Sequence, residues 1–216
     1  FNASYAATWF QMARKYSDGI QVPAYNKKTL KVLYKNIADY TTKENGISLF
    51  LNDLHTCGVK FFVLPHLEKT YLDGAAFLHK GNPVVVYTAR YKRIDNFWFT
   101  LAHEIAHVLK HLNDKTPFVL DNLREKTNDK QEQEANGLAS KQLKHKEILD
   151  FLEPYFNYLT VGKIQECSHV LNIHPAIIIG TLAFKEKISF RNQKLFNENV
   201  LDVIPTDFIH EALLAA

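Results

Sequence analysis

The sequence predicts an α+β fold that is mostly helical. Through most of the chain, apolar residues recur at spacings of three and four, which is typical of amphipathic helices packed on a core. Between residues 59 and 88 the pattern changes to three short runs rich in β-branched and aromatic residues, separated by turn residues. We therefore expect a small three-stranded antiparallel sheet, packed on the helix that follows it.

Composition limits the class of protein. The 216 residues are enough for one substantial core or two small ones, and a formal charge of +3 is too slight to indicate a nucleic-acid partner. Cys57 and Cys167 are far apart, which does not resemble a disulfide framework and fits a reducing compartment. No apolar run approaches the ~20 residues that span a bilayer, and no secretory signal is visible. We expect a cytoplasmic protein without membrane contact; because the sequence does not begin with Met, an upstream domain is left open.

The N-terminal segment, residues 1–57, is predicted to be helical. A first helix covers residues 3–16 and stops at Asp18-Gly19. Asn26 is a suitable N-cap for a second helix. A third helix is expected from about residue 41 to 57, with Gly58 in the left-handed conformation that ends it.

The predicted strands cover residues 59–64, 75–79 and 84–88. Pro83 begins the third of them, and a proline there is compatible with an edge position because it cannot donate to a neighbouring strand. A sheet edge beside the next helix could hold an extended peptide by strand addition.

The next helix, residues 97–111, contains His103-Glu104-Ile105-Ala106-His107. The i, i+4 spacing places both imidazoles on one face, where they can bind a single metal ion. Glu104 then lies beside the ion, where a carboxylate can serve as the general base of a metallopeptidase. Because the apolar positions form a neighbouring stripe, one face of this helix is expected in the core and the next at the floor of a cleft.

A catalytic zinc ion usually has three protein ligands. The pattern that supplies a third histidine is absent, since Lys110 stands at its glycine position and Asn113 at its histidine position. The alternative is a carboxylate on the following helix, where Glu132 and Glu134 are both candidates.

Helical geometry favours Glu132 over Glu134. Glu132 points closer to the apolar direction defined by Ala135, Leu138, Ala139 and Leu143, whereas Glu134 points away from it. Asn136 lies one turn beyond Glu132 and is expected to hydrogen-bond a metal-bound imidazole. We predict His103, His107 and Glu132 as metal ligands, with Glu134 as the leading rival.

The rest of the chain is expected to be a loop followed by short helices. Residues 113–128 read as a loop beside the site, and a helix begins near Asp129. Further helical pieces are predicted at residues 148–158, 161–171, 175–185 and 192–199, and the tail after Pro205 is expected to dock on the body. We divide the chain into an N-terminal helical segment (1–57), a core (58–145) and a C-terminal helical region (146–216), together one compact unit.

The motif Phe99 to His107, followed by Glu132-x-x-Ala135-Asn136, resembles the ImmA/IrrE family of zinc-dependent metallopeptidases. This resemblance implies a zincin-like domain and limited intracellular proteolysis, with a helix-turn-helix repressor or antitoxin as the usual substrate. It also implies that His103, His107 and Glu132 bind zinc and that Glu104 is catalytic. The segment 163–177 further resembles members associated with helix-turn-helix regulators of the HigA-like type. The alternative is a non-catalytic, metal-binding regulatory or antitoxin-like module.

Three further groups of residues are candidates for a functional role. Residues 161–185 have the spacing of a helix-turn-helix, but the second helix is apolar nearly all round, so direct DNA binding by this chain is not expected. His111 is a candidate fourth ligand, although we expect its side chain to reach solvent. Donors for a developing oxyanion remain open among four residues: Tyr87, Arg90, Tyr155 and Tyr158.

Overall fold

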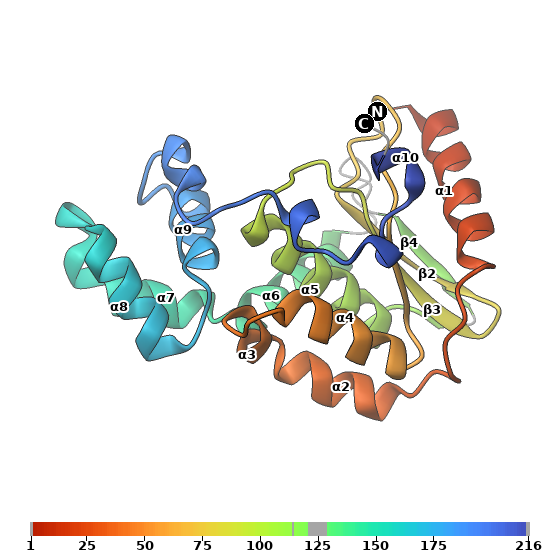
Figure 1. The fold of residues 1–216 in the computed structure, drawn as a ribbon, viewed down its shortest axis with the longest axis horizontal. Coiled ribbons are helices and arrows are strands. Elements are labelled where there is room, and N and C mark those ends of the chain that lie inside the picture. Colours follow the sequence, from red (N-terminus) through yellow and green to blue (C-terminus); the bar gives the residue numbers. More distant parts are fainter. Residues whose placement is uncertain (1, 114, 121–128, 215–216) are drawn as a thin grey trace.

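The computed structural model describes residues 2–113, 115–120 and 129–214 (Figure 1). Helices dominate this part of the chain, which confirms the predicted α+β, mostly helical class. In chain order, the elements are α1 (Ala3–Ser17), α2 (Lys27–Lys35), α3 (Ile37–Thr41), α4 (Gly46–Thr56), β1 (Lys60–Val63), β2 (Gly74–His79), β3 (Asn82–Tyr87), α5 (Ile94–Lys110), β4 (Phe118–Leu120), α6 (Asp129–Gln142), α7 (His145–Leu152), α8 (Val161–Leu171), α9 (Pro175–Phe184) and α10 (Glu211–Leu214). Short 3₁₀ helices follow α7 (Glu153–Tyr158) and α9 (Phe190–Lys194, Val200–Asp202, Thr206–Phe208).

The sheet is mixed and has four strands in the order β1-β3-β2-β4, so the prediction of three antiparallel strands was wrong in detail. β2 and β3 form a hairpin, joined through Lys80 and Gly81, which both have positive φ as a type I′ turn requires. After β1 the chain instead crosses to the far side of β3 before β2 begins, and β1 therefore pairs parallel with β3. β4 adds to the outer side of β2 in antiparallel register.

The position of Pro83 and the structure of residues 113–120 differ from the sequence predictions. Pro83 lies in the interior strand β3, not at an edge; the ladder with β1 begins one residue later, at Val84, so no bond to β1 is lost. The predicted loop 113–128 contains β4, which forms because residues 118–120 align with Ala75 to Phe77 of β2. Residues 121–128 of that predicted loop lie outside the described residues.

The two faces of the sheet bury different layers. Because side chains alternate along a strand, Phe62, Phe77 and Val86 face α1, where they pack around Trp9 and Ala13. The opposite face belongs to the main core, which includes α5. Figure 1 shows α1 and α5 on the two sides of the sheet. The sheet is therefore covered by helices on both faces.

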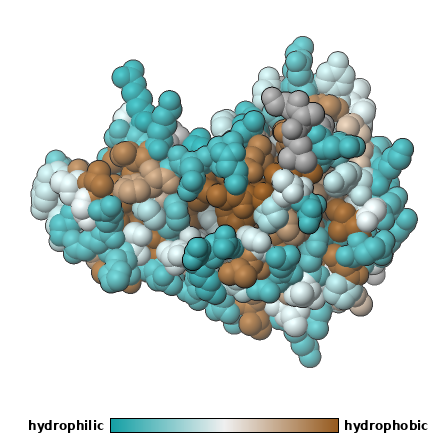
Figure 2. Space-filling model, viewed as in Figure 1, coloured by the Kyte–Doolittle hydropathy of each residue, from teal (hydrophilic) through white to brown (hydrophobic). Residues whose placement is uncertain are grey.

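The main core gathers residues from all three predicted segments, from Leu30 in α2 to Ile209 near the C-terminus. α9 approaches the start of α5 closely, because Gly180 lacks the side chain that would meet Asp95 at 2.5 Å. The helices α7, α8 and α9 form a lobe at the end of the molecule remote from the sheet (Figure 1). On the face drawn in Figure 2, hydrophobic residues gather beneath the notch between this lobe and the sheet-containing body.

Several helix boundaries match the prediction. The side chain of Asn26 accepts hydrogen bonds from the N–H groups of Lys28 and Thr29, as expected of an N-cap, and Gly58 has φ +79. The helix predicted from about residue 41 to 57 corresponds to α4, which begins later, at Gly46; residues 37–41 form a separate short helix, α3. A Cβ at Gly46 would lie 1.8 Å from the carbonyl oxygen of Tyr40, so only glycine allows this close turn between α3 and α4.

The C-terminal tail docks on the body as predicted. Phe208 and Ile209 are buried, and the backbone N–H of His210 donates to the carbonyl oxygen of Val63 at 2.9 Å. Ile209 also forms a bridge with Val63 on the outer side of β1. The predicted helix 192–199 was wrong: a 3₁₀ helix ends at Lys194, a turn follows at Leu195 and Phe196, where Phe196 has a positive φ of 60°, and the next 3₁₀ helix begins at Val200.

Candidate metal centre

Helix α5 places two histidines at the centre of the molecule. All its residues from Thr100 to Leu109 are buried, because the helix packs against the sheet, α6 and α9. His103 and His107 are 5% and 1% exposed, and they lie one turn apart on the same side. Their Nε2 atoms are 2.9 Å apart. The predicted pair is therefore brought together with both nitrogens aimed at the same point.

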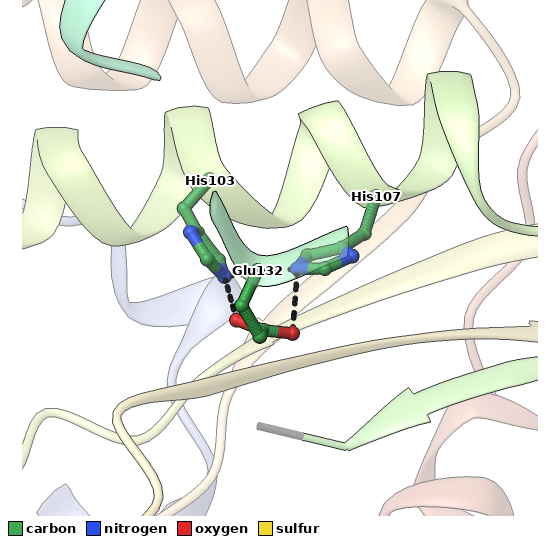
Figure 3. A group of neighbouring side chains, drawn as sticks. All are labelled: His103, His107 and Glu132. Atoms are coloured by element: carbon green, nitrogen blue, oxygen red, sulfur yellow. Dashed lines mark hydrogen bonds and ion pairs between the residues drawn. The ribbon is translucent and has the colours of Figure 1, made fainter. Parts of the chain in front are cut away.

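Glu132, at the start of α6, completes the group (Figure 3). Its Oε2 lies 3.2 Å from Nε2 of His103 and its Oε1 3.2 Å from Nε2 of His107. Three ligand atoms, one from each of these residues, lie within 4.8 Å of one another. Glu132 reaches the site because Ala135 and Ala139, buried on the same helix, pack that face of α6 into the main core.

The spacing and chemistry of the three side chains fit a bound metal ion. An ion held tetrahedrally at about 2.0–2.1 Å has ligand atoms about 3.3 Å apart, close to the separations found between these nitrogens and oxygens. Two imidazoles and one carboxylate form a donor set that suits a borderline divalent transition metal. Three protein ligands leave a further coordination position for water or substrate.

Asn136 hydrogen-bonds the imidazole of His103 through the ring nitrogen that does not face Glu132. Its Oδ1 lies 3.0 Å from Nδ1 of His103. An amide oxygen only accepts hydrogen bonds, so Nδ1 of His103 must carry the proton. The lone pair of Nε2 then faces Glu132 and is available to a metal. This is the contact that the sequence predicts for Asn136.

Glu104 lies in a tight space between α5 and the beginning of β2. It is 2% exposed. The backbone of Gly74 passes so close that a Cβ there would meet Oε1 of Glu104 at 2.6 Å and Cγ2 of Thr100 at 2.7 Å. Sequence reasoning did not identify Gly74, because the role of this glycine depends on a contact between two elements far apart in the chain.

Glu134 lies outside this group and contacts other residues. Its Oε2 is 3.2 Å from Nε2 of His111, and its Oε1 is 3.6 Å from Nζ of Lys110. His111 is 7% exposed, so the expectation that it reaches solvent was wrong. The physical reason is that its ring fits between His107 and Glu134, with Nδ1 of His111 2.9 Å from Nδ1 of His107. A third histidine at the same i, i+4 spacing was the sequence signal for this contact.

Burial shapes the electrostatics of the site. It lowers the pKa of His107, although the hydrogen bond to Glu132 opposes this effect. A lowered pKa favours the neutral imidazole, which is the form that binds metal. The hydrogen bond from His111 lowers the pKa of Glu134 and so keeps this carboxylate ionised.

The candidate oxyanion donors occupy different surroundings. The hydroxyl of Tyr87 donates to the carbonyl oxygen of Tyr91, and burial strongly raises the pKa of Tyr87. Arg90 donates to the carboxylate of Asp73 and to a backbone carbonyl. Tyr155 and Tyr158 pack against each other in the 3₁₀ helix after α7. These contacts commit Tyr87 and Arg90 to structural hydrogen bonds and do not select a donor.

The two histidines of α5 and Glu132 of α6 all fall within a segment that matches a known protein family. The model of the IrrE N-terminal-like domain, Peptidase_M78, matches residues 42–177, more than half of the chain. The chain belongs to this family. The Peptidase_M78 match begins just before α4 and ends within α9, so it includes the whole sheet, α5 and α6. Searches of curated proteins and of solved structures found no match.

Family membership supports a peptidase-type domain, and the site in this member is built by α5 and α6. Within the described ranges, no individual helix has the length and apolar character to cross a membrane. The bent pair α8–α9 meets that test by length and composition, and seven of the ten residues of α9 are buried in the protein.

Proposed function

We propose that this protein is a zinc-dependent metalloendopeptidase that performs limited proteolysis in the cytoplasm. The observation that carries the proposal is the convergence of His103, His107 and Glu132 on one point, with the buried Glu104 on the next position of the same helix. Two imidazoles and a carboxylate are a common ligand set of catalytic zinc in peptidases. Zinc, when bound, would polarise both water and the scissile carbonyl.

Glu104 would move the proton. Peptide hydrolysis requires a base to take a proton from the attacking water and an acid to return one to the leaving amine. A carboxylate beside the ligand group can do both in turn, and Glu104 is the neighbour of His103 on a buried helix. Gly74 keeps the space that its carboxylate occupies. The three ligands hold the site, and Glu104 supplies the proton transfer.

The proposed substrate is a helix-turn-helix repressor or antitoxin. This part of the proposal rests on the family resemblance. Both cysteines are free thiols buried in the core, which supports a reducing compartment, where such DNA-binding proteins act. We propose that DNA is contacted by the substrate and not by this chain.

The test compares wild-type protein with Glu104→Gln after both are loaded with zinc. Each is incubated with a peptide library and with a repressor encoded beside its gene, and products are identified by mass spectrometry. The wild type should cleave within the repressor, while Glu104→Gln should hold equal zinc and cleave nothing. If the wild type binds one zinc ion per chain and cleaves none of these substrates, the protein is a metal-binding regulatory module and the proposal fails.

A further inference from the structure

We propose that His111 and Glu134 act as a positioning pair that fixes the proton on His107 and so aims its Nε2 at the metal. This inference rests on the proposed zinc site, and it concerns two residues outside the ligand group. The pair is formed by the end of α5 and the first turns of α6. The pair would hydrogen-bond Nδ1 of His107, as Asn136 hydrogen-bonds Nδ1 of His103.

The contacts form a continuous line of hydrogen bonds away from the site. Nδ1 of His107 lies 2.9 Å from Nδ1 of His111, and Nε2 of His111 lies 3.2 Å from Oε2 of Glu134. The backbone N–H of His111 also donates to the carbonyl oxygen of His107 at 2.8 Å, which fixes the start of its side chain. His111 is 7% exposed, so water has little access to its ring.

The direction of each proton follows from the end of this line. An ionised carboxylate only accepts hydrogen bonds, so Nε2 of His111 carries a proton toward Glu134. In the neutral ring, Nδ1 of His111 is then an acceptor, and the proton between the two rings must belong to Nδ1 of His107. That leaves the lone pair of Nε2 of His107 facing Glu132 and His103.

The strength of the effect should decrease along the line. His111 is buried and contacts the ligand directly, whereas half of the Glu134 side chain is exposed and its contact is screened by water. Lys110 binds the other oxygen of Glu134 and is itself half exposed. His111 should therefore matter most for zinc affinity, Glu134 less, and Lys110 least.

The first measurement is zinc affinity by competition with a chelator. Loss of a hydrogen-bond partner behind a metal-bound histidine commonly costs about 10–100-fold in affinity, and we expect a loss of that size for His111→Ala. His111→Gln should recover most of the loss, because its amide oxygen can accept from Nδ1 of His107. Glu134→Ala should lose less than His111→Ala, and the matched control Lys110→Ala should bind zinc within roughly twofold of the wild type.

The second measurement determines which ring nitrogen of His107 carries the proton. Long-range ¹H–¹⁵N spectra of the full chain, recorded with and without zinc, report which ring nitrogen of His107 carries hydrogen. The wild type should show Nδ1–H in both states, and metal-free His111→Ala should show a share of the Nε2–H form. The inference is overturned if His111→Gln binds zinc as weakly as His111→Ala. It is also overturned if His111→Ala retains wild-type affinity and the Nδ1–H form. A wild type that binds no zinc would refute the proposed function, while the metal-free spectra would still decide the role of His111.

Discussion

Gly74 and Glu104 are in such close contact that a Cβ on the glycine would lie 2.6 Å from Oε1 of the carboxylate. Gly74→Ala should therefore push the Glu104 side chain out of position without touching a metal ligand. A displacement of about 1 Å in a catalytic group can cost roughly 100-fold in rate, and we expect a loss of that order in peptide cleavage with zinc content unchanged. Cleavage rate and zinc stoichiometry, measured on the same preparation, check this.

The matched control is Gly137→Ala on α6. A Cβ at Gly137 meets nothing within 4 Å, and the residue lies inside a helix. Alanine should leave cleavage unchanged and raise the free energy of unfolding by up to about 1 kcal/mol. Equal effects of Gly74→Ala and Gly137→Ala on cleavage would show that the space beside Glu104 is not critical.

The two glutamates of α6 should differ in their effect on zinc. Glu132→Ala removes a side chain that lies 3.2 Å from both histidines, whereas Glu134→Ala removes a contact to His111. Zinc retention after dialysis should therefore fall far more in Glu132→Ala. The reverse order would show that the ligand assignment is wrong.

Asn136 should control the first histidine. Asn136→Ala removes the oxygen that accepts from Nδ1 of His103, and a loss of about 10–100-fold in zinc affinity is expected. Asn136→Asp keeps an acceptor at the same place and should bind zinc at least as well as the wild type. Chelator competition on all three proteins measures this, and similar losses in both variants would contradict the proposed contact.

His145 should make stability depend on pH. Burial, with a smaller effect of the Lys185 charge, lowers the pKa of His145 to about 4, and its ring stacks on Phe99. The unfolded chain takes up a proton on this residue as pH falls below about 6.5, but the folded chain does so only near 4. The contribution of neutral His145 to the free energy of unfolding should therefore be fully present above about pH 6.5. It should decrease as pH falls toward 4, by on the order of 3 kcal/mol in total.

His145→Phe keeps an aromatic ring beside Phe99 and removes this titration. Between about pH 8 and pH 5, the variant should lose on the order of 2 kcal/mol less stability than the wild type. Urea denaturation with a chelator present in every sample measures the difference without a contribution from zinc release. Parallel pH profiles for the two proteins would refute this assignment.

The parts of the site that the sequence predicts are those governed by helical spacing. His103 and His107 share a face because they are four residues apart, and Glu132 points inward because Ala135 and Ala139 define the buried side of α6. The N-cap at Asn26 is equally local. Such features depend on a few neighbouring residues and can be read from one sequence.

Features that depend on distant segments were missed. The parallel pairing of β1 with β3 is decided by where the chain crosses the sheet, and the turn residues between strands do not encode that choice. The burial of His111 depends on Glu134, which lies 23 residues later on another helix. The role of Gly74 requires knowing that β2 begins against α5.

The most direct test of the proposed metal site is anomalous diffraction at the zinc edge from crystals of the zinc-loaded wild type. We expect one strong peak within about 2.2 Å of Nε2 of His103, Nε2 of His107 and a carboxylate oxygen of Glu132. A peak held instead by His111 and Glu134, or no peak near α5 after stoichiometric zinc is added, would contradict it.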